Sequence, residues 1–282
     1  MTNVVSLETA TPRASADDAP ILLRETQDGI TTLTMNRPRA ANALSERMIS
    51  ELTDAIIACG TDTRTKVIVL AANGAVFCAG HDVKEMTGHR ADADGGRAHF
   101  TQIMEACATL MQTIVACPKP VIAAVHSTAT AAGCQLVATC DLAIAAESAG
   151  FCTPGVHIGL FCSTPMVALT RNVPRKKAME MLLTGDTISA EAAAEMGLVN
   201  RVVADADVLN EAQEMAAVIA SKSPATVATG KVAFYRQIEM PLAEAYSFAA
   251  DVMVRNMMHR DAEEGIGAFI EKRQPEWDAG ND

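Results

Sequence analysis

The sequence predicts an α/β body followed by a helical C-terminal region, and three observations support this. Segments 66–70 and 120–125 are continuous apolar runs, which are typical of parallel strands covered on both faces. Residues 126–161 alternate small-residue turns with short apolar runs, in a repeated order of strand, turn and helix. From Pro174 onward the apolar spacing is helical almost throughout. We therefore expect a core of stacked β-β-α units over residues 20–205 and helices over residues 206–282.

The first elements follow from local patterns. Residues 21–35 alternate apolar and polar side chains around Gln27-Asp28-Gly29, which predicts a β-hairpin. Ser45 is a good N-cap for the helix that follows, and Gly60 is expected to end that helix in a left-handed conformation. Residues 99–116 have helical spacing and lie between the two apolar runs.

The C-terminal region is expected to hold several amphipathic helices. Gly197 and Gly230 suggest helix ends, and Pro241 suggests a helix start. Asp261 with Glu264 forms a capping-box-like pattern, which predicts the start of a last helix that ends near Arg273. These helices either cover the α/β body or pack on neighbouring subunits, and the sequence leaves both arrangements open.

Composition limits the class of partner. The chain of 282 residues has 23 Lys and Arg against 34 Asp and Glu, a net charge of −11, so we expect no nucleic-acid partner. No apolar run reaches the length of a membrane span, so no membrane partner is expected. Residues 1–19 are rich in Thr, Ser and Ala and lack the apolar stretch of a signal peptide, which predicts a disordered tail.

The eight cysteines are scattered through apolar segments, without a C-x-x-C motif or a histidine pair at zinc spacing. This pattern is typical of reduced core residues, and it predicts a cytoplasmic protein without a bound metal.

Two small-residue turns are candidates for chemistry. One runs through residues 77–82 and the other through residues 131–135, and each leads into a helix whose first N–H groups lack helical partners. If the turns converged, their amides could stabilise the developing oxyanion of a thioester or ester, each contributing roughly 3 kcal/mol. The spacing alone favours two turns selected for close packing.

Four motifs in this order resemble the crotonase, or enoyl-CoA hydratase/isomerase, superfamily, and the resemblance covers about residues 20 to 278. They are Asn36-Arg37-Pro38 with Asn42-Ala43-Leu44, the turn Cys78 to Met86, Ala132 to Leu136 with Cys140-Asp141, and Phe269 to Arg273.

The resemblance implies a crotonase-like spiral of β-β-α repeats and a helical C-terminal trimerisation region, with homotrimers that often pair into hexamers. It also implies a lyase or isomerase of fatty acid metabolism that acts on a coenzyme A thioester and needs no prosthetic group or metal.

Carried over by position, the resemblance places the two oxyanion-hole amides on His81 and Ala132. It places the coenzyme near Arg39, Ala40 and Lys84, with Phe269 and Lys272 reaching it from the last helix of the same or a neighbouring subunit. These cations would hold the coenzyme phosphates, which an acidic protein otherwise repels.

This sequence departs from the family at the two glutamates that position water and move its proton in hydratases, because Gln135 and Gly155 stand there. The Gln135 amide can orient a water as a catalytic residue, but it does not ionise and cannot act as the general base, a role typically worth about 10² to 10⁴ in rate. We therefore expect slow hydration. Together with the segments 153–156 and 159–165, these residues resemble a subgroup of enoyl-CoA-hydratase-domain-containing proteins that lacks both glutamates and is mitochondrial in animals.

Three functions stay open. The first is a hydratase/isomerase-type reaction at the oxyanion hole. His81 after Ala-Gly also resembles the acyl-CoA decarboxylase branch of the superfamily, which suggests decarboxylation of a malonyl-type thioester. The third alternative is a catalytically inactive acyl-CoA-binding or scaffold protein.

Two further residues near these motifs have structural explanations. His157 follows Gly155 closely, but a lone histidine on a strand is more often a core residue. Asp82 is expected to cap the helix that carries Lys84.

Overall fold

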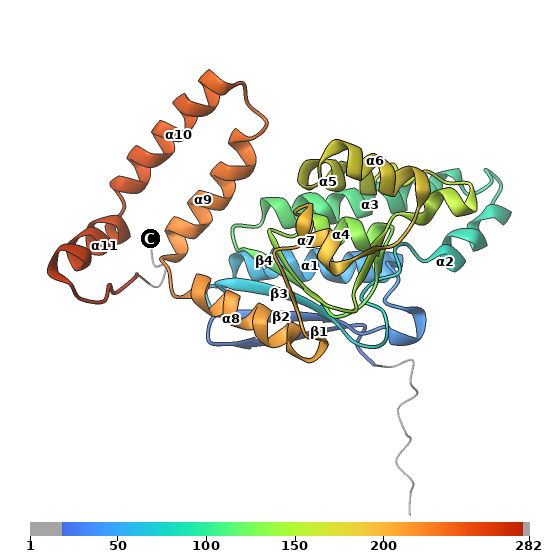
Figure 1. Cartoon of the computed structure of the whole chain (residues 1–282), viewed down its shortest axis with the longest axis horizontal. Helices are drawn as coiled ribbons and strands as arrows, with labels where there is room; N and C mark the ends of the chain where they lie inside the picture. The colour runs from blue at the N-terminus through green and yellow to red at the C-terminus, as the bar shows by residue number, and fades with distance from the viewer. Residues whose placement is uncertain (1–18, 279–282) are drawn as a thin grey trace, which may run out of the picture.

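The computed structural model describes residues 19–278 (Figure 1). The tail predicted for residues 1–19 therefore lies almost wholly outside the described residues.

A six-stranded sheet forms the centre of the body, in the order β1-β2-β3-β4-β6-β9. The predicted hairpin is confirmed, because β1 and β2 are antiparallel and Asp28 and Gly29 between them have positive φ angles. The remaining pairs are parallel, and β4 is buried along its whole length, as its continuous apolar run predicts. The strands are β1 (Leu22–Gln27), β2 (Ile30–Met35), β3 (Val67–Ala72), β4 (Val121–Val125), β6 (Leu142–Ala146) and β9 (Arg201–Val203).

A second, three-stranded sheet has the order β5-β7-β8, and β5 is parallel to β7 whereas β8 is antiparallel to it. Its strands are β5 (Ala129–Thr130), β7 (Gly150–Cys152) and β8 (Ile188–Ser189). Because β5 leads directly into the second small-residue turn, this sheet fixes where that turn lies.

Helices cover both faces of the large sheet. α1 (Glu46–Thr61) packs against α3 (Arg97–Ala116) on one side, and α8 (Val208–Ala220) packs against β3, β4 and β6 (Figure 1). Ser45 caps α1 as predicted, since its side chain accepts from the Met48 N–H. Gly60 does not end this helix, which continues to Thr61 and has Asp62 as its C-cap.

The other helices of the body are short. They are η1 (Pro38–Ala40), α2 (Val83–Gly88), η2 (His89–Ala91), α4 (Ala132–Thr139), η3 (Pro154–Ile158), α5 (Pro165–Asn172), α6 (Arg175–Thr184), α7 (Ala190–Glu195) and η4 (Asp205–Asp207). Gly197 has a positive φ just beyond α7, which confirms the helix end predicted there.

Three further helices, α9 (Pro224–Gln237), α10 (Leu242–Met257) and α11 (Arg260–Glu271), project from the body as an arm (Figure 1). Gly230 lies inside α9, so the helix end predicted there is wrong. The start of α11 is capped by His259, whose side chain accepts from the Asp261 N–H, and not by Asp261. The Asp261 carboxylate instead accepts from the Ser223 hydroxyl.

A buried ion pair ties this arm to the sheet. Lys231 on α9 donates to the Asp141 carboxylate at 2.7 Å and to the backbone oxygens of Ile114 and Lys119. Tyr235 also donates to Asp141, at 2.9 Å. The arm exposes large apolar side chains, among them Phe234, Leu242, Tyr246, Met253, Met258, Phe269 and Ile270.

Candidate active site

The two small-residue turns of the sequence lie side by side. Cys78 pairs with Ala129 in a parallel bridge, and the Thr130 N–H donates to the Cys78 oxygen at 3.0 Å. Gly80 is in the left-handed region at φ +84, and a Cβ there would lie 2.9 Å from the Ala131 Cβ and 3.1 Å from the Ala132 nitrogen. The close approach of the turns therefore requires glycine at position 80.

The backbone N–H groups of His81 and Ala132 are both uncommitted, which means that neither has a hydrogen-bond acceptor among the described residues. Leu44 forms backbone hydrogen bonds to the residues on either side of His81. Its N–H donates to the Gly80 oxygen, and its oxygen accepts from the Asp82 N–H. Ala132 is the first residue of α4, where no acceptor exists within the helix. Neither of the two N–H groups donates to any acceptor within residues 19–278.

Ala131 has an unusual backbone conformation, with φ 51 and ψ −117. A non-glycine residue in such a region is strained by roughly 1–3 kcal/mol, and strain of this kind clusters at functional sites. Its own N–H donates to the Cys152 oxygen at 2.9 Å, which holds the turn against β7.

Both turns open into one cavity of about 630 Å³, a size suited to a small-molecule ligand. His81, Ala131 and Ala132 form one part of its wall. The rest is largely apolar and includes Val83, Met86, Phe100, Met104, Leu160 and Phe161. No aspartate or glutamate of the described chain lines this cavity.

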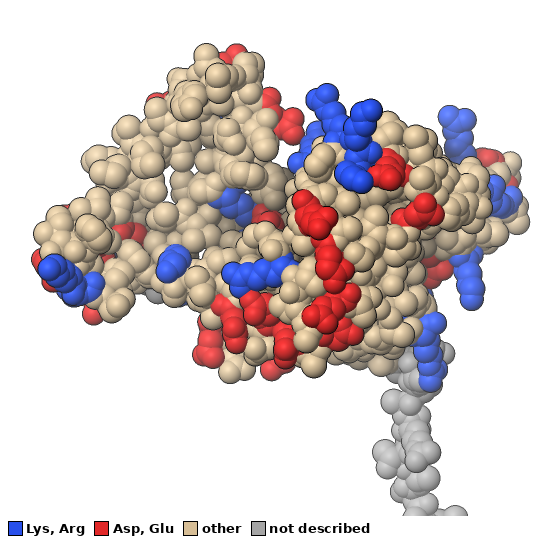
Figure 2. Space-filling view, viewed as in Figure 1, with Lys and Arg blue, Asp and Glu red and all other residues tan. Residues whose placement is uncertain are grey.

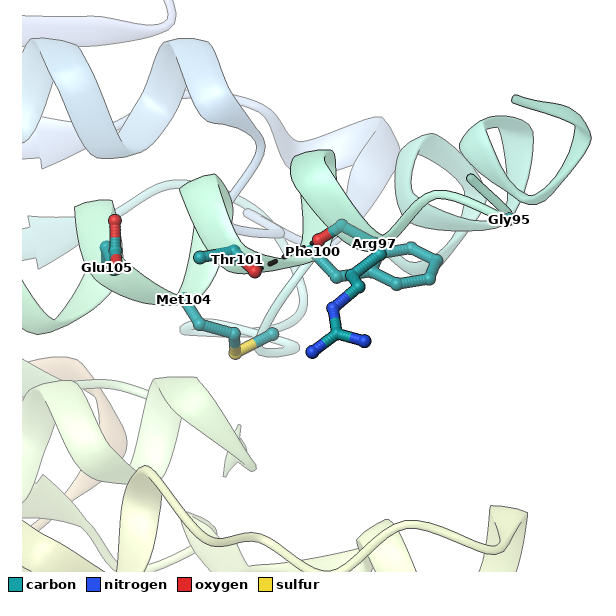
Figure 3. Close-up of a pocket in the computed structure, with 6 residues that line it drawn as sticks. All are labelled: Gly95, Arg97, Phe100, Thr101, Met104 and Glu105. Carbon is teal, nitrogen blue, oxygen red and sulfur yellow. Dashed lines mark hydrogen bonds between the residues drawn. The ribbon is translucent and has the colours of Figure 1, made fainter. Parts of the chain in front are cut away.

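A shallow hollow adjoins the cavity along α3. Figure 3 shows its lining residues, with the Arg97, Phe100 and Met104 side chains extending from the same side of the helix. Phe100 and Met104 line the hollow and the cavity alike, so the two spaces adjoin at these side chains. The Arg90 guanidinium carbon lies 5.5 Å from the centre of the Phe100 ring, and Arg90 also lines the cavity.

Sequence patterns did not reveal this wall. They predicted the helix over residues 99–116, but helical spacing does not say which neighbour a given face meets.

Two histidines line the cavity, and their surroundings differ. His157 Nε2 lies 2.8 Å from the backbone oxygen of Thr184, and this hydrogen bond holds the ring in place. His81 is partly buried, and this burial lowers the pKa of its imidazole. His81 Nε2 is enclosed and has no hydrogen-bond partner in the part of the chain that the structure describes.

The residues at the two glutamate positions lie in different surroundings. Gln135 on α4 is buried, its Oε1 finds no partner among the described residues, and it is not one of the residues that line the cavity. Gly155 lines the cavity, but a Cβ there would lie 2.9 Å from both the Leu160 oxygen and the Cys162 sulfur. The loop after Gly155 thus occupies the space into which a longer side chain would extend.

The predicted coenzyme residues fall into two groups. Arg39 and Ala40 lie on η1, and Lys84 lies on α2. These elements are joined because Arg37 Nη2 donates to Asp82 at 3.2 Å, while Asp82 caps α2 by accepting from the Glu85 N–H. The predicted helix-capping role of Asp82 is confirmed.

Phe269 and Lys272 lie at the end of α11, at the opposite end of the molecule from α2 (Figure 1). Phe269 is 84% exposed. Within one chain these two residues cannot meet a ligand held at Lys84.

Charge is unevenly distributed over the surface. Figure 2 shows Lys and Arg side chains gathered over α5 and α6, and acidic side chains in a band over α7 and the start of α8. Although the net charge of the chain is negative, the helices that follow the cavity residues 163–165 carry a cationic region.

All eight cysteines are buried, as predicted, and none is paired in a disulfide within the described range. Burial raises the pKa of the Cys134 thiol to about 12 and raises that of Cys162 as well, so neither is a thiolate near neutral pH. Between residues 19 and 278 no group of His, Cys, Asp and Glu is placed to hold a metal ion. None of the described helices combines the length and apolarity needed to cross a membrane.

Comparisons with known proteins agree with this fold. A family model described as enoyl-CoA hydratase/isomerase matches residues 25–280. The rat (Rattus norvegicus) enoyl-CoA hydratase domain-containing protein 3, mitochondrial, is 44% identical over 268 residues, which cover 95% of this chain and 88% of the relative. A crystal structure of enoyl-CoA hydratase from Mycobacterium smegmatis superposes with a TM-score of 0.88 and 50% identity, covering 92% of this chain and 99% of that chain. The human enoyl Coenzyme A hydratase domain-containing protein 3 superposes with a TM-score of 0.87 and 43% identity, covering 92% and 100%.

These relatives contradict the predicted cytoplasmic location. The rat, mouse and human relatives all carry the word mitochondrial in their names. The prediction failed because buried cysteines without disulfides do not distinguish the cytoplasm from other compartments.

The agreement in fold confirms the predicted crotonase-like α/β architecture with its helical C-terminal region. The chain belongs to the enoyl-CoA hydratase/isomerase family, within the crotonase superfamily.

Proposed function

We propose that this protein is an acyl-CoA-processing enzyme of the lyase or isomerase type, in which the His81 and Ala132 amides polarise the thioester carbonyl. The observation that carries the proposal is that two uncommitted N–H groups from separate turns lie at one largely apolar cavity. Such preorganised donors stabilise the negative charge that develops on the thioester oxygen, and the loss of one donor typically costs about 10² to 10³ in rate.

Hydration by the two-carboxylate route is expected to be slow. No carboxylate lines the described cavity wall, Gly155 has no side chain, and Gln135 lies outside that wall. Water that enters the cavity therefore meets no group that could act as its general base in the usual manner. The amides would still stabilise an enolate formed by a different reaction.

The coenzyme would be held by Arg39, Ala40 and Lys84, with no prosthetic group. Phe269 and Lys272 are exposed at the far end of the arm, so they could reach the coenzyme only in a neighbouring subunit. This supports a homotrimer or a dimer of trimers, in which the apolar side chains of the arm are covered.

Decarboxylation of a malonyl-type acyl-CoA is the second candidate. The observation that favours it is again the cavity wall, because no described carboxylate there would repel the carboxylate of the substrate. A largely apolar wall also favours the loss of a carboxylate as carbon dioxide.

The proposal is tested by removing one donor. Ala132 is the first residue of α4, a position where proline is tolerated, so Ala132→Pro deletes the N–H without removing a hydrogen bond of the helix. Ala190→Pro is a matched control, because Ala190 is the equally buried first residue of α7 and does not line the cavity.

Calorimetry with acyl-CoA esters is combined with turnover assays on crotonyl-CoA, a β,γ-enoyl-CoA and malonyl-CoA. We expect binding by both variants, and turnover reduced about 10²- to 10³-fold only in Ala132→Pro. Equal turnover in the two variants would contradict the role of the amide. Binding without any turnover by the unmodified protein would favour the inactive acyl-CoA-binding protein.

A further inference from the structure

The segment of residues 83–91, which holds α2 and η2, is attached to the body at few points. None of these residues is buried, and Figure 1 shows α2 at the outer edge of the body. The segment nevertheless supplies four residues to the wall of the cavity, namely Val83, Met86, Thr87 and Arg90. An element with few buried contacts opens at a low cost in free energy. The contacts that hold this segment therefore control how much of the cavity wall is in place.

The far end of the segment is held by two stacked imidazoles. The rings of His89 on η2 and His99 on α3 are inclined by 15° to each other, and their centres are 3.6 Å apart. Gly96, at the start of α3, has a positive φ, and a Cβ there would lie 2.7 Å from the His89 oxygen. Glycine at this position thus allows the close approach of η2 to α3 that stacking requires.

Each ring has a carboxylate beside its Nδ1. The Asp92 carboxylate lies 2.9 Å from His89 Nδ1, and the Glu46 carboxylate at the start of α1 lies 3.1 Å from His99 Nδ1. Within residues 19–278 no other carboxylate is paired with the two rings. Both carboxylates are partly exposed, so water screens their attraction to a charged ring.

The remaining charged groups near the pair have contacts of their own. Glu85 on α2 accepts from the N–H of the first residue of α1 at 3.1 Å, and Asp94 accepts from two N–H groups at the start of α3. The Arg90 guanidinium lies over the Phe100 ring. Arg97 lines the hollow along α3.

His99 has no suitable place for a second proton while the rings are stacked. The Glu46 carboxylate favours a proton on Nδ1, and Nε2 is enclosed without a partner in the described part of the chain. A proton added at Nε2 would bury a charge without an acceptor, beside a second imidazole that can itself become charged. Acid therefore favours an arrangement in which the rings separate and His99 reaches water.

We propose that the His89–His99 stack is a pH-sensitive latch. It holds residues 83–91 in the cavity wall while at least one ring is neutral, and it releases them when both rings are protonated. The two histidines are positioning residues, because they act through the wall residues of the segment. The inference rests on the proposed function only for its ligand: an acyl-CoA in the cavity would be bound less tightly once this part of the wall moves away.

The test separates the charge of the latch from its packing. His89→Phe keeps a planar ring that cannot take up a proton, and His89→Ala removes the ring. His126→Gln is a matched control outside the segment, because His126 Nε2 lies 2.8 Å from the Gly74 oxygen and a glutamine amide can donate to the same atom.

Two quantities are measured at about pH 8 and about pH 5.5, on either side of the usual titration of imidazole. Hydrogen exchange, corrected for the intrinsic rate at each pH, gives the protection of the amides of residues 83–91 relative to those of α8. Calorimetry gives the Kd of butyryl-CoA. The coenzyme phosphates also titrate in this range, so each Kd is compared with that of His126→Gln at the same pH.

We expect the relative protection in the unmodified protein and in His126→Gln to fall about 2- to 10-fold at the lower pH, as for the loss of one aromatic pair. The Kd should rise by a similar factor. His89→Phe should keep its protection at both pH values and bind more tightly than His126→Gln at the lower one. In His89→Ala the protection should already be low at the higher pH.

An equal fall in protection in His89→Phe, or constant protection in the unmodified protein, would overturn the latch. If His89→Phe does not fold, His89→Ala decides, and protection equal to that of the unmodified protein at the higher pH would overturn the latch. Protection that changes as expected without binding of any acyl-CoA ester would leave the latch standing and contradict the proposed function.

Discussion

Gly133 lies directly against the backbone of Cys78, so closely that a Cβ on Gly133 would lie 2.2 Å from the Cys78 oxygen. This contact joins the first turn of α4 to the end of the segment that carries His81. Because the obstructing atom is a backbone oxygen, a side chain at this position could be accommodated only by moving one of the two turns.

Gly133→Ala should therefore separate the turns and lower the free energy of unfolding by about 1–3 kcal/mol, with a loss of turnover. Gly230→Ala is the matched control. Gly230 lies inside α9, and a Cβ there would have no neighbour within 4 Å, so alanine should raise stability by about 0.5–1 kcal/mol. Urea denaturation measures both, and full stability with full turnover in Gly133→Ala would contradict the close approach of the turns.

Glutamate at position 155 should not restore hydration. Its Cβ would meet the Leu160 oxygen and the Cys162 sulfur at 2.9 Å, so we expect Gly155→Glu to lower stability by about 1–3 kcal/mol without raising crotonyl-CoA hydration. Gln135→Glu, which preserves side-chain size, separates the effect of a new carboxylate from that of the clash. A stable Gly155→Glu variant that hydrates crotonyl-CoA rapidly would show that the loop after Gly155 yields easily.

Loss of the Lys231 ammonium should be costly, because it leaves the Asp141 carboxylate and two backbone oxygens without their donor. We expect Lys231→Met to lower the free energy of unfolding by about 3–5 kcal/mol. A double-mutant cycle with Asp141→Asn measures the coupling, and the double variant should cost less than the sum of the single ones. A loss in Lys231→Met well under 1 kcal/mol would mean that the arm is held by other contacts.

The partly buried imidazole of His81 should make stability depend on pH. Because its pKa is lowered in the folded state, the unfolded chain takes up this proton first as pH falls below about 6.5. Proton uptake then stabilises the unfolded state, so the stability contributed by His81 is present above that pH and declines below it.

The free energy of unfolding of the unmodified protein should consequently fall relative to that of His81→Gln between about pH 7.5 and about pH 5.5. Denaturation curves at the two pH values give this difference. A difference that does not change with pH would show that His81 titrates alike in the folded and unfolded chain.

The strands and the hairpin could be predicted from sequence because their signals are local. The Asp28-Gly29 turn and the apolar run of β4 depend on neighbouring residues only. The helix ends predicted at Gly60 and Gly230 were wrong because glycine permits a left-handed end without requiring one. Where the backbone hydrogen bonds can continue, the helix continues.

The candidate site also has features with a local sequence signal and features without one. Small residues at the two turns indicated that backbone amides are accessible, and the structure brings these turns together. The Phe100 and Met104 wall and the obstruction at Gly155 depend on how α3 and the loop after Gly155 pack, which no local pattern contains. The positions of Phe269 and Lys272 depend on the direction of the arm.

The carbonyl stretching frequency of a bound, isotope-labelled acyl-CoA thioester tests the central claim most directly. Two hydrogen bonds from the His81 and Ala132 amides should polarise the carbonyl and shift its stretch to a lower frequency than that of the free thioester. The shift should shrink in Ala132→Pro and persist in Ala190→Pro. A bound thioester whose carbonyl frequency equals the free value, or is the same in both variants, would contradict the account.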